Sequence, residues 1–196
     1  AAADAMPQLV REANLPLIAD IHYDHTMALA ALKAGVAKLR INPGNIGSRD
    51  HVREVARAAQ DCGVPIRVGV NRGSLHRRYD ELVKRDPAGA LVQSGLDEIE
   101  ALAAFGFTDV AVSLKSSTPA EVVEACRRFS AQCDVPQHLG VTEAGTLLAG
   151  TSLSVAAMSV LLGEGIGDTV RISLADDPVY EIKAAFHMLH ALGLRE

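Results

Sequence analysis

The chain has 196 residues, of which 48% are hydrophobic and 22% are charged, enough for one sizeable core or for part of a larger one. Its 19 Lys and Arg and 24 Asp and Glu give a formal net charge of -5, which argues against a broad nucleic-acid-binding surface. No apolar run approaches the roughly 18 residues of a membrane span, and the Ala-rich start lacks the basic flank of a signal peptide. We therefore expect a cytoplasmic protein that binds neither nucleic acid nor membrane, in which any anion site is local.

The three cysteines, Cys62, Cys126 and Cys133, are odd in number and form no C-x-x-C motif. This pattern indicates neither a disulfide framework nor a zinc site. We expect each of them to be a small buried or half-buried thiol, and we predict no metal ligands in this chain.

Short apolar segments alternate with helical patterns along the sequence. A helix is predicted first, over residues 4–13, with no strand before it. Strands are predicted at residues 17–21, 36–41, 65–70, 109–114, 137–141 and 169–174. Further helices are predicted at residues 26–34, 50–62, 96–105, 119–132, 147–162 and 178–192. Ser48 or Asp50, Ser94 and Thr118 can cap helix N-termini, and Gly35, Gly63, Gly106 and Gly193 stand where helices end.

A strand followed by a helix, repeated six times, predicts an α/β fold with parallel strands, as in an open doubly wound sheet or a (β/α)8 barrel. Polar side chains on the strands favour the barrel. Lys38, Arg40 and Asn42 share one face of their strand, and the other strands carry Asp20 and His22, Arg67 and Asn71, Ser113 and Lys115, His138, or Arg171 and Ser173. A sheet covered by helices on both sides would bury these charges, whereas a barrel gives them one shared mouth.

The predicted fold is therefore a TIM-type (β/α)8 barrel, present here as a partial barrel of about six βα units. Because six strands are two short of eight, we interpret residues 1–196 as one barrel segment of a longer polypeptide.

The polar faces predict a site for an anion. Five cations, Lys38, Arg40, Arg67, Lys115 and Arg171, would surround one basin together with Asn42, Asn71 and Ser173. Arginine forks and lysine point charges suit a phosphorylated or diphosphate ligand. The alternative is a structural network in which the cations pair with Asp20, Asp109 and Glu143. Lys38, which is furthest from its strand end, fits that alternative best.

Three other features are candidates for chemistry. The turn NPGNIG after Arg40 could direct backbone N–H groups at an anion or could simply be a tight turn. Glu143, at a strand end beside glycine, could transfer protons, hydrogen-bond a substrate hydroxyl or pair with Arg171. His22 and His138 could contact the ligand or could be satisfied core residues.

Six motifs follow one another along the chain: ADIHYD (19–24), KLRINPGNIG (38–47), PIRVGVNRGSL (65–75), SLKSS (113–117), HLGVTEAGT (138–146) and GIGDTVRISL (165–174). Together they resemble the hydroxymethylbutenyl diphosphate synthase family. The motifs are co-linear and run from about Pro16 to the C-terminus, which makes them far more specific together than any one alone.

The resemblance implies a TIM-type barrel of the methylerythritol phosphate route to isoprenoids. Such an enzyme binds 2-C-methyl-D-erythritol 2,4-cyclodiphosphate and opens its ring by reductive dehydration with a 4Fe-4S cluster. Flavodoxin or ferredoxin would deliver the electrons, and the complete enzyme would be a homodimer. The resemblance places substrate binding on Arg40, Asn42, Arg67, Asn71, Lys115, Arg171 and Ser173, to which we add His22 and His138. It makes Glu143 the proton donor or hydroxyl partner.

The resemblance also implies parts that this sequence lacks. In the family, three cysteines and a glutamate of a C-terminal domain hold the cluster, and two barrel strands precede the region matched here. Arg72 and Gln137 stand where the family usually has a small and an apolar residue. Two alternatives to a cluster-dependent synthase remain: a phosphate-binding barrel with lyase or isomerase chemistry at Lys115 or Glu143, and an inactive truncated chain.

Overall fold

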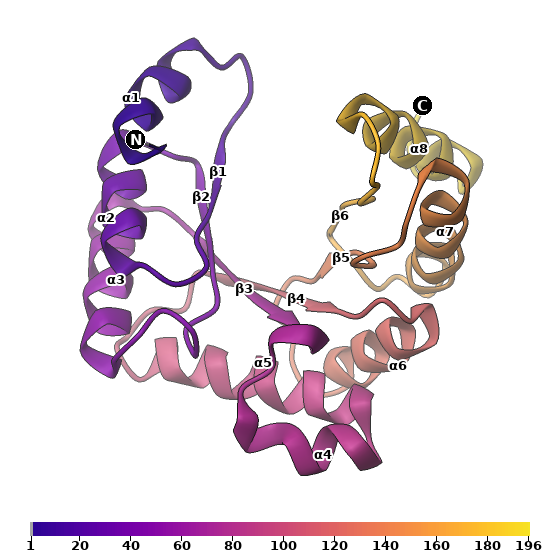
Figure 1. Cartoon of the computed structure of the whole chain (residues 1–196), viewed down its shortest axis with the longest axis horizontal. Helices are drawn as coiled ribbons and strands as arrows, with labels where there is room; N and C mark the ends of the chain where they lie inside the picture. The colour runs from indigo at the N-terminus through magenta and orange to yellow at the C-terminus, as the bar shows by residue number, and fades with distance from the viewer. Residues whose placement is uncertain (1) are drawn as a thin grey trace. The chain divides into compact units, whose positions relative to one another are not determined.

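The computed structural model describes residues 2–196 (Figure 1). Its first element is helix α1 (Ala2–Glu12), which precedes any strand, as predicted. The others are, in order, β1 (Ile18–Asp20), α2 (His25–Ala34), β2 (Lys38–Ile41), α3 (Arg49–Cys62), β3 (Ile66–Asn71), the 3-10 turns η1 (Arg72–Ser74) and η2 (Arg77–Tyr79), α4 (Asp80–Arg85), α5 (Pro87–Ala103), β4 (Val110–Lys115), α6 (Pro119–Ser130), β5 (His138–Leu139), α7 (Leu147–Gly163), β6 (Thr169–Val170) and α8 (Pro178–Ala191).

The strands are ordered in space as they are in the chain. Strands β1 to β4 form one sheet in sequence order, and β5 pairs with β6. A parallel bridge between Val112 of β4 and Gln137 links the chain just before β5 to β4. A doubly wound sheet reverses its strand order at a switch point, whereas a barrel adds strands in sequence. Among the described residues, this order confirms the predicted α/β partial barrel with six βα units.

The described chain divides into two compact units. The first contains the chain up to Gly69 together with Leu96–Ala111, and the second contains Val70–Gly95 and Val112–Glu196. Strands β3 and β4 therefore each begin in the first unit and end in the second. This division does not test whether residues 1–196 form a single barrel domain, which remains a prediction.

The core of the first unit is formed by strands β2 and β3 and one face of α3. Leu39, Ile41, Ile66 and Val68 are fully buried on the strands. Their partners on α3 recur at helical spacing: Val52, Val55, Ala56 and Ala59. Of the two predicted caps, Ser48 begins this helix, in a capping box with His51, and the predicted Gly63 ends it in the left-handed conformation.

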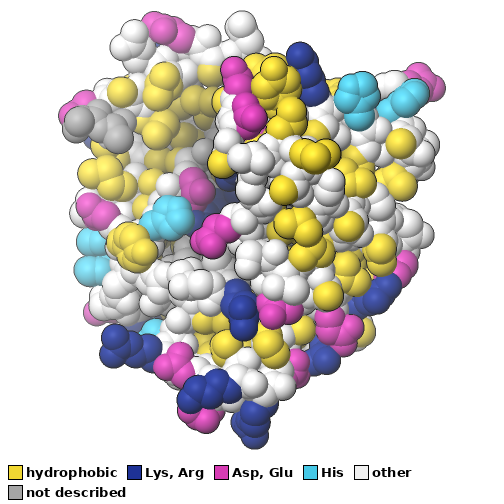
Figure 2. All heavy atoms as spheres, turned by 45° about the vertical axis from the view of Figure 1, so that its right-hand side comes forward, with side chains coloured by type: hydrophobic (Ala, Val, Ile, Leu, Met, Phe, Trp, Pro, Cys, Tyr) yellow, Lys and Arg dark blue, Asp and Glu magenta, His cyan; other side chains and the backbone are white. Residues whose placement is uncertain are grey.

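In the second unit, helices α6 and α7 pack against each other. Phe129, Leu139, Met158 and Leu161 are fully buried there. The outer faces of α7 and α8 are different, because Leu148, Val160, Ile182 and Phe186 are exposed on them. Figure 2 shows the hydrophobic side chains on this face of the molecule. None of the helices in the described part of the chain is long and apolar enough to cross a membrane.

The predicted start of the helix at residues 96–105 is wrong. Helix α5 begins at Pro87, and the expected cap Ser94 lies inside it, only 4% exposed. The local cause is Asp86, whose side chain accepts a hydrogen bond from the N–H of Gly89 at 3.0 Å, as an N-cap does, just before a proline at the first helical position. This hydrogen bond and the contact with Arg128 hold the pKa of Asp86 below its usual value.

Candidate functional site

Three polar residues lie side by side across the first three strands. Arg40 on β2 is in register with Asp20 on β1 and with Arg67 on β3. Residues in register on neighbouring parallel strands share one face of the sheet, as the alternation in the sequence predicted. Asp20 and Arg40 lie at or near the carboxyl ends of their strands, where a barrel places its site, whereas Arg67 is the second residue of the longer strand β3.

Arg40 is buried, with only 7% of its side chain exposed, and other groups of the first unit hold its guanidinium. Its Nη1 donates to Asp20 Oδ1 at 2.8 Å and lies 3.2 Å from His22 Nε2, and its Nη2 donates to the carbonyl oxygen of Gly69 at 3.4 Å. The pairing with Asp20 agrees with the alternative in which the strand cations form a structural network of ion pairs. A guanidinium has five N–H donors, so the same arrangement also leaves donors for an anion.

Gly69 makes room for this guanidinium. A Cβ atom at position 69 would overlap Nε, Cζ and Nη2 of Arg40. The guanidinium therefore lies directly over the backbone of β3, a position that only glycine permits. Gly69 was not among the residues predicted from the sequence, because a glycine inside a strand is not by itself a sign of a site.

Asn42 and the following turn form a compact loop. Asn42 is only 9% exposed, and its Oδ1 accepts the N–H of Gly44 at 3.1 Å, an Asx-type turn. Glu98 of α5, a buried carboxylate, lies so close to Gly44 that a Cβ there would meet its Oε1 at 2.5 Å. The loop uses the amide oxygen of Asn42, so the amide NH2 is the group that would contact a ligand.

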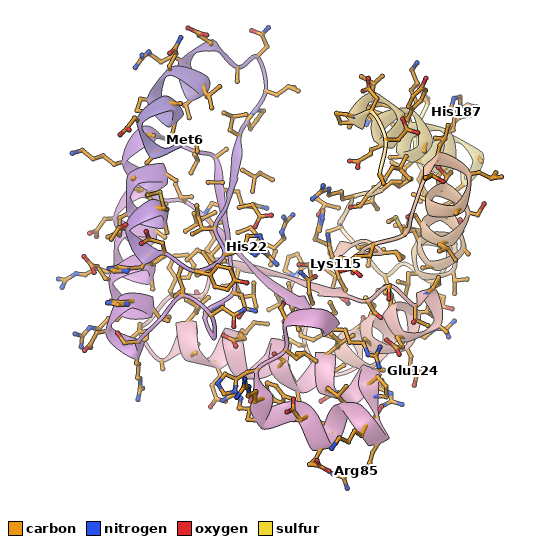
Figure 3. The ribbon with its side chains drawn as sticks, in the orientation of Figure 1. Met6, His22, Arg85, Lys115, Glu124 and His187 are labelled. Atoms are coloured by element: carbon orange, nitrogen blue, oxygen red, sulfur yellow. The ribbon has the colours of Figure 1, made fainter. Side chains whose placement is uncertain are left out.

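His22 and Lys115, both labelled in Figure 3, belong to different units. His22 follows β1 in the first unit, is 55% exposed and lies 3.5 Å from Asp20 Oδ1 through its Nε2. Lys115 ends β4 in the second unit and is only 8% exposed. A Cβ at Gly140 would approach Nζ of Lys115 to 3.0 Å, so this lysine packs over the backbone that follows β5.

The other candidates of the second unit are placed by β3, β5 and the chain after β6. Asn71 is half-buried at the end of β3. His138 is buried, and its Nδ1 lies 2.9 Å from Thr169 Oγ1, its partner in register on β6. This contact involves one of the two ring nitrogens, and it does not decide between a core histidine and a role in binding.

Glu143 lines a pocket of about 220 Å³ together with Arg171, Ser173 and Glu181. Among the described residues, Glu143 is the one non-glycine residue with positive φ, at 53°. The left-handed conformation is rare for such residues and is often retained at functional sites. Arg171 does not pair with Glu143. Its Nε lies 3.9 Å from Oε2 of Glu181, a residue in the first turn of α8 that was not predicted from the sequence.

The cysteines do not fit an iron–sulfur cluster. In the part of the chain that the structure describes, no group of three or more His, Cys, Asp and Glu residues could hold a metal ion. The expectation that each thiol is buried or half-buried is wrong for Cys62, which is exposed, whereas Cys126 is buried and Cys133 is half-buried. Burial raises the pKa of Cys126 to about 12, which opposes the thiolate form that a cluster ligand needs.

Solved structures with a similar fold have unrelated sequences. The dihydropteroate synthase of Yersinia pestis matches with a TM-score of 0.63 over 97% of this chain and 74% of its own, at 12% identity. The dihydropteroate synthase of Xanthomonas albilineans matches with a TM-score of 0.54 at 14% identity, over 98% of this chain and 60% of its own. At this level of identity, the likeness concerns the fold alone.

Curated proteins with similar sequences share one name. The 4-hydroxy-3-methylbut-2-en-1-yl diphosphate synthase (flavodoxin) of Symbiobacterium thermophilum is 47% identical over 194 residues, 99% of this chain and 52% of its own length. The protein of the same name from Fusobacterium nucleatum is 48% identical over 195 residues, 100% of this chain and 55% of its own length. This chain therefore spans about half the length of the curated relatives it matches.

A protein-family profile agrees with these relatives and covers most of the chain. The profile is described as the GcpE TIM-barrel domain, and it matches residues 1–186. Together with the sequential order of the parallel strands, this match shows that the chain belongs to the GcpE TIM-barrel family.

Proposed function

We propose that this chain is the substrate-binding barrel segment of a 4-hydroxy-3-methylbut-2-en-1-yl diphosphate synthase and that it binds 2-C-methyl-D-erythritol 2,4-cyclodiphosphate. The observation that carries the proposal is the pair of arginines in register, Arg40 and Arg67, on the neighbouring strands β2 and β3. Two neighbouring guanidinium groups suit the two phosphoryl groups of such a ligand, because each can donate a fork of hydrogen bonds. The resemblance to relatives with this name supplies the identity of the ligand.

The proposed contacts extend the sequence prediction residue by residue. In the first unit, Arg40, Asn42 and Arg67 would donate to phosphate oxygens, and His22 would contact the ligand beside Asp20. In the second unit the proposed contacts are Asn71, Lys115, His138, Arg171 and Ser173. Binding energy from these groups would orient the ring for opening.

Glu143 is the proposed proton donor. Ring opening turns a ring oxygen into a leaving group, and the reductive dehydration releases a hydroxyl as water, so both steps benefit from a positioned acid. The left-handed backbone at Glu143 and its place in a pocket with Arg171 and Ser173 support this role.

The complete reaction needs electrons. A 4Fe-4S cluster would supply them, with its ligands outside the residues described here, since the cysteines of this chain do not fit one. Flavodoxin, which the names of the relatives print, or ferredoxin would be the electron donor. A homodimer of the complete enzyme and a cytoplasmic location stay predictions.

Calorimetric titration of the chain with the cyclodiphosphate tests this proposal. Arg40→Ala or Arg67→Ala should each weaken binding by roughly 1.5–3 kcal/mol, because a charged hydrogen bond is lost. Lys38→Ala is the matched control, since Lys38 lies on the same strand as Arg40 but at its beginning. Thermal melts of each variant would show that the fold is retained. Equal affinities for the three variants would contradict a shared anion site at Arg40 and Arg67.

A further inference from the structure

The segment that follows β6 carries two of the proposed ligand contacts, Arg171 and Ser173, but it is not part of a regular strand. Backbone hydrogen bonds fix its two ends. The N–H of Arg171 donates to Leu139 O at 2.9 Å, and the N–H of Ala175 donates to Gly145 O at 2.9 Å. The second bond ties the segment to the loop that contains Glu143.

Between these ends, a side chain holds the segment. The N–H of Leu174 donates to Oε1 of Glu181 at 2.8 Å. The other carboxylate oxygen of Glu181, Oε2, lies 3.9 Å from Nε of Arg171. One carboxylate thus contacts both the backbone and the guanidinium of the same segment.

Burial distinguishes the two partners. The side chain of Glu181 is 17% exposed, whereas that of Arg171 is 53% exposed. Glu181 is also fixed at its base, because Asp177 caps α8 and Pro178 occupies the first turn of the helix. An exposed arginine has many rotamers, and holding it in one costs entropy on binding. A carboxylate on a capped helix reduces that cost by orienting the guanidinium beforehand.

We propose that Glu181 is a positioning residue: it holds the Arg171–Ala175 segment in place and so presents Arg171 and Ser173 to an anionic ligand in the pocket beside Glu143. This inference rests on the proposed function for the identity of the ligand. Glu181 itself contacts the protein, and its effect on binding passes through the segment, chiefly through Arg171.

A double-mutant cycle tests this indirect action. In the full chain, titrated with the cyclodiphosphate, Glu181→Ala should weaken binding about 10-fold, whereas in the Arg171→Ala background the same change should weaken it less than about 2-fold. Glu181→Gln keeps an oxygen acceptor for Leu174 N–H but loses the charge that faces Arg171, so it should weaken binding about 3-fold. Equal losses in both backgrounds would overturn the proposal.

Hydrogen exchange of the Leu174 amide gives a second readout that needs no ligand. Its protection should be lost in Glu181→Ala and largely kept in Glu181→Gln. Glu164→Gln is the matched control, because it removes another carboxylate of the second unit, which pairs with Arg127 away from the pocket. This control should change neither the affinity nor the exchange at Leu174.

The binding titration and the hydrogen exchange distinguish a failure of the proposed function from a failure of the positioning role of Glu181. If the unsubstituted chain fails to bind the cyclodiphosphate, the proposed ligand is wrong, and the exchange of Leu174 alone decides whether Glu181 holds the segment. If the chain binds and Glu181→Ala neither weakens binding nor exposes Leu174, Glu181 has no positioning role.

Discussion

Arg40 shows how a buried strand accommodates a cation. The guanidinium gains a carboxylate partner in Asp20, a carbonyl partner in Gly69 and space above a residue without a side chain. A buried ion pair of this kind adds little net stability, because desolvation offsets the attraction. Its more useful effect is on geometry, since a guanidinium held on one side presents its other donors in a fixed direction.

Glu143 should be destabilising through its backbone. A left-handed conformation costs roughly 1–2 kcal/mol for a residue with a Cβ atom, and glycine avoids this cost. We expect Glu143→Gly to be more stable than Glu143→Ala by about 1 kcal/mol, because alanine keeps the penalty whereas glycine loses it. Chemical denaturation of the two variants measures the difference. If Glu143→Ala were the more stable of the two, the positive φ would impose no strain.

The cysteines should differ in their reactivity. Cys126 is 1% exposed, and burial raises its pKa to about 12, so it stays a protonated thiol at neutral pH and well above it. Cys62 is exposed and serves as the internal control. Brief alkylation of the native chain at pH 8, followed by mass spectrometry, should label Cys62 and leave Cys126 unmodified.

The raised pKa of Cys126 also makes the stability of the chain depend on pH. In the unfolded chain this thiol has the ordinary cysteine pKa of 9.0, whereas in the folded chain it keeps its proton to about 12. The contribution of Cys126 to stability is therefore complete below pH 9 and is lost progressively as the pH rises toward 12. Rapid labelling of Cys126 in the folded chain would contradict this burial.

At the level of elements, strand β3 carries a glycine over which the guanidinium of Arg40, a candidate site residue, packs. In Gly69→Ala, the new methyl group would occupy the place of the Arg40 guanidinium and break its contact with Asp20. We expect weaker cyclodiphosphate binding and a loss of about 1–3 kcal/mol in stability from overpacking. Gly73→Ala is the matched control, because nothing lies within 4 Å of a Cβ at that position. Both losses should shrink in an Arg40→Ala background, and binding that Gly69→Ala leaves unchanged would refute this arrangement.

Secondary structure was predictable where local signals agreed. Helix α3 has an apolar stripe, a capping box at Ser48 and a left-handed Gly63, so its position followed from the sequence. Helix α5 was predicted too short, because its first half, from Pro87, is largely small residues without a clear apolar stripe, and Ser94 resembles a cap. Asp86 before Pro87 is also a typical N-cap pattern, but it directly follows the short helix α4, which was not predicted from the sequence.

The candidate site was predictable only in part, for a related reason. Alternation along a strand indicates which residues share a face, and the register of Asp20, Arg40 and Arg67 confirms that inference. Alternation gives no information about which helix residue contacts a strand end. An acidic residue in the first turn of a helix is ordinary, because it complements the helix dipole, so Glu181 gave no distinctive signal before its contacts were known.

At the level of the whole chain, we expect ligand binding to lie in this barrel segment and the redox chemistry to lie outside it. The relatives are about twice as long as this chain, and the described residues contain no set of ligands for a cluster. Under the proposed function, polar side chains on the strands would supply the binding groups, whereas electron transfer needs thiolates that the described residues do not gather. The chain is therefore expected to bind the cyclodiphosphate without reducing it.

Reconstitution with iron and sulfide under anaerobic conditions tests this separation. We expect the chain to remain colourless and to hold no stoichiometric 4Fe-4S cluster. No group of three or more His, Cys, Asp and Glu among the described residues could hold a metal ion, and Cys126 is buried and resists ionisation. The full-length relative from Symbiobacterium thermophilum, treated in parallel, is the comparison. Iron and sulfide analysis together with the visible spectrum measures cluster content. A stoichiometric cluster on this chain would overturn the expectation, and single Cys→Ser variants at positions 62, 126 and 133 would then identify its ligands.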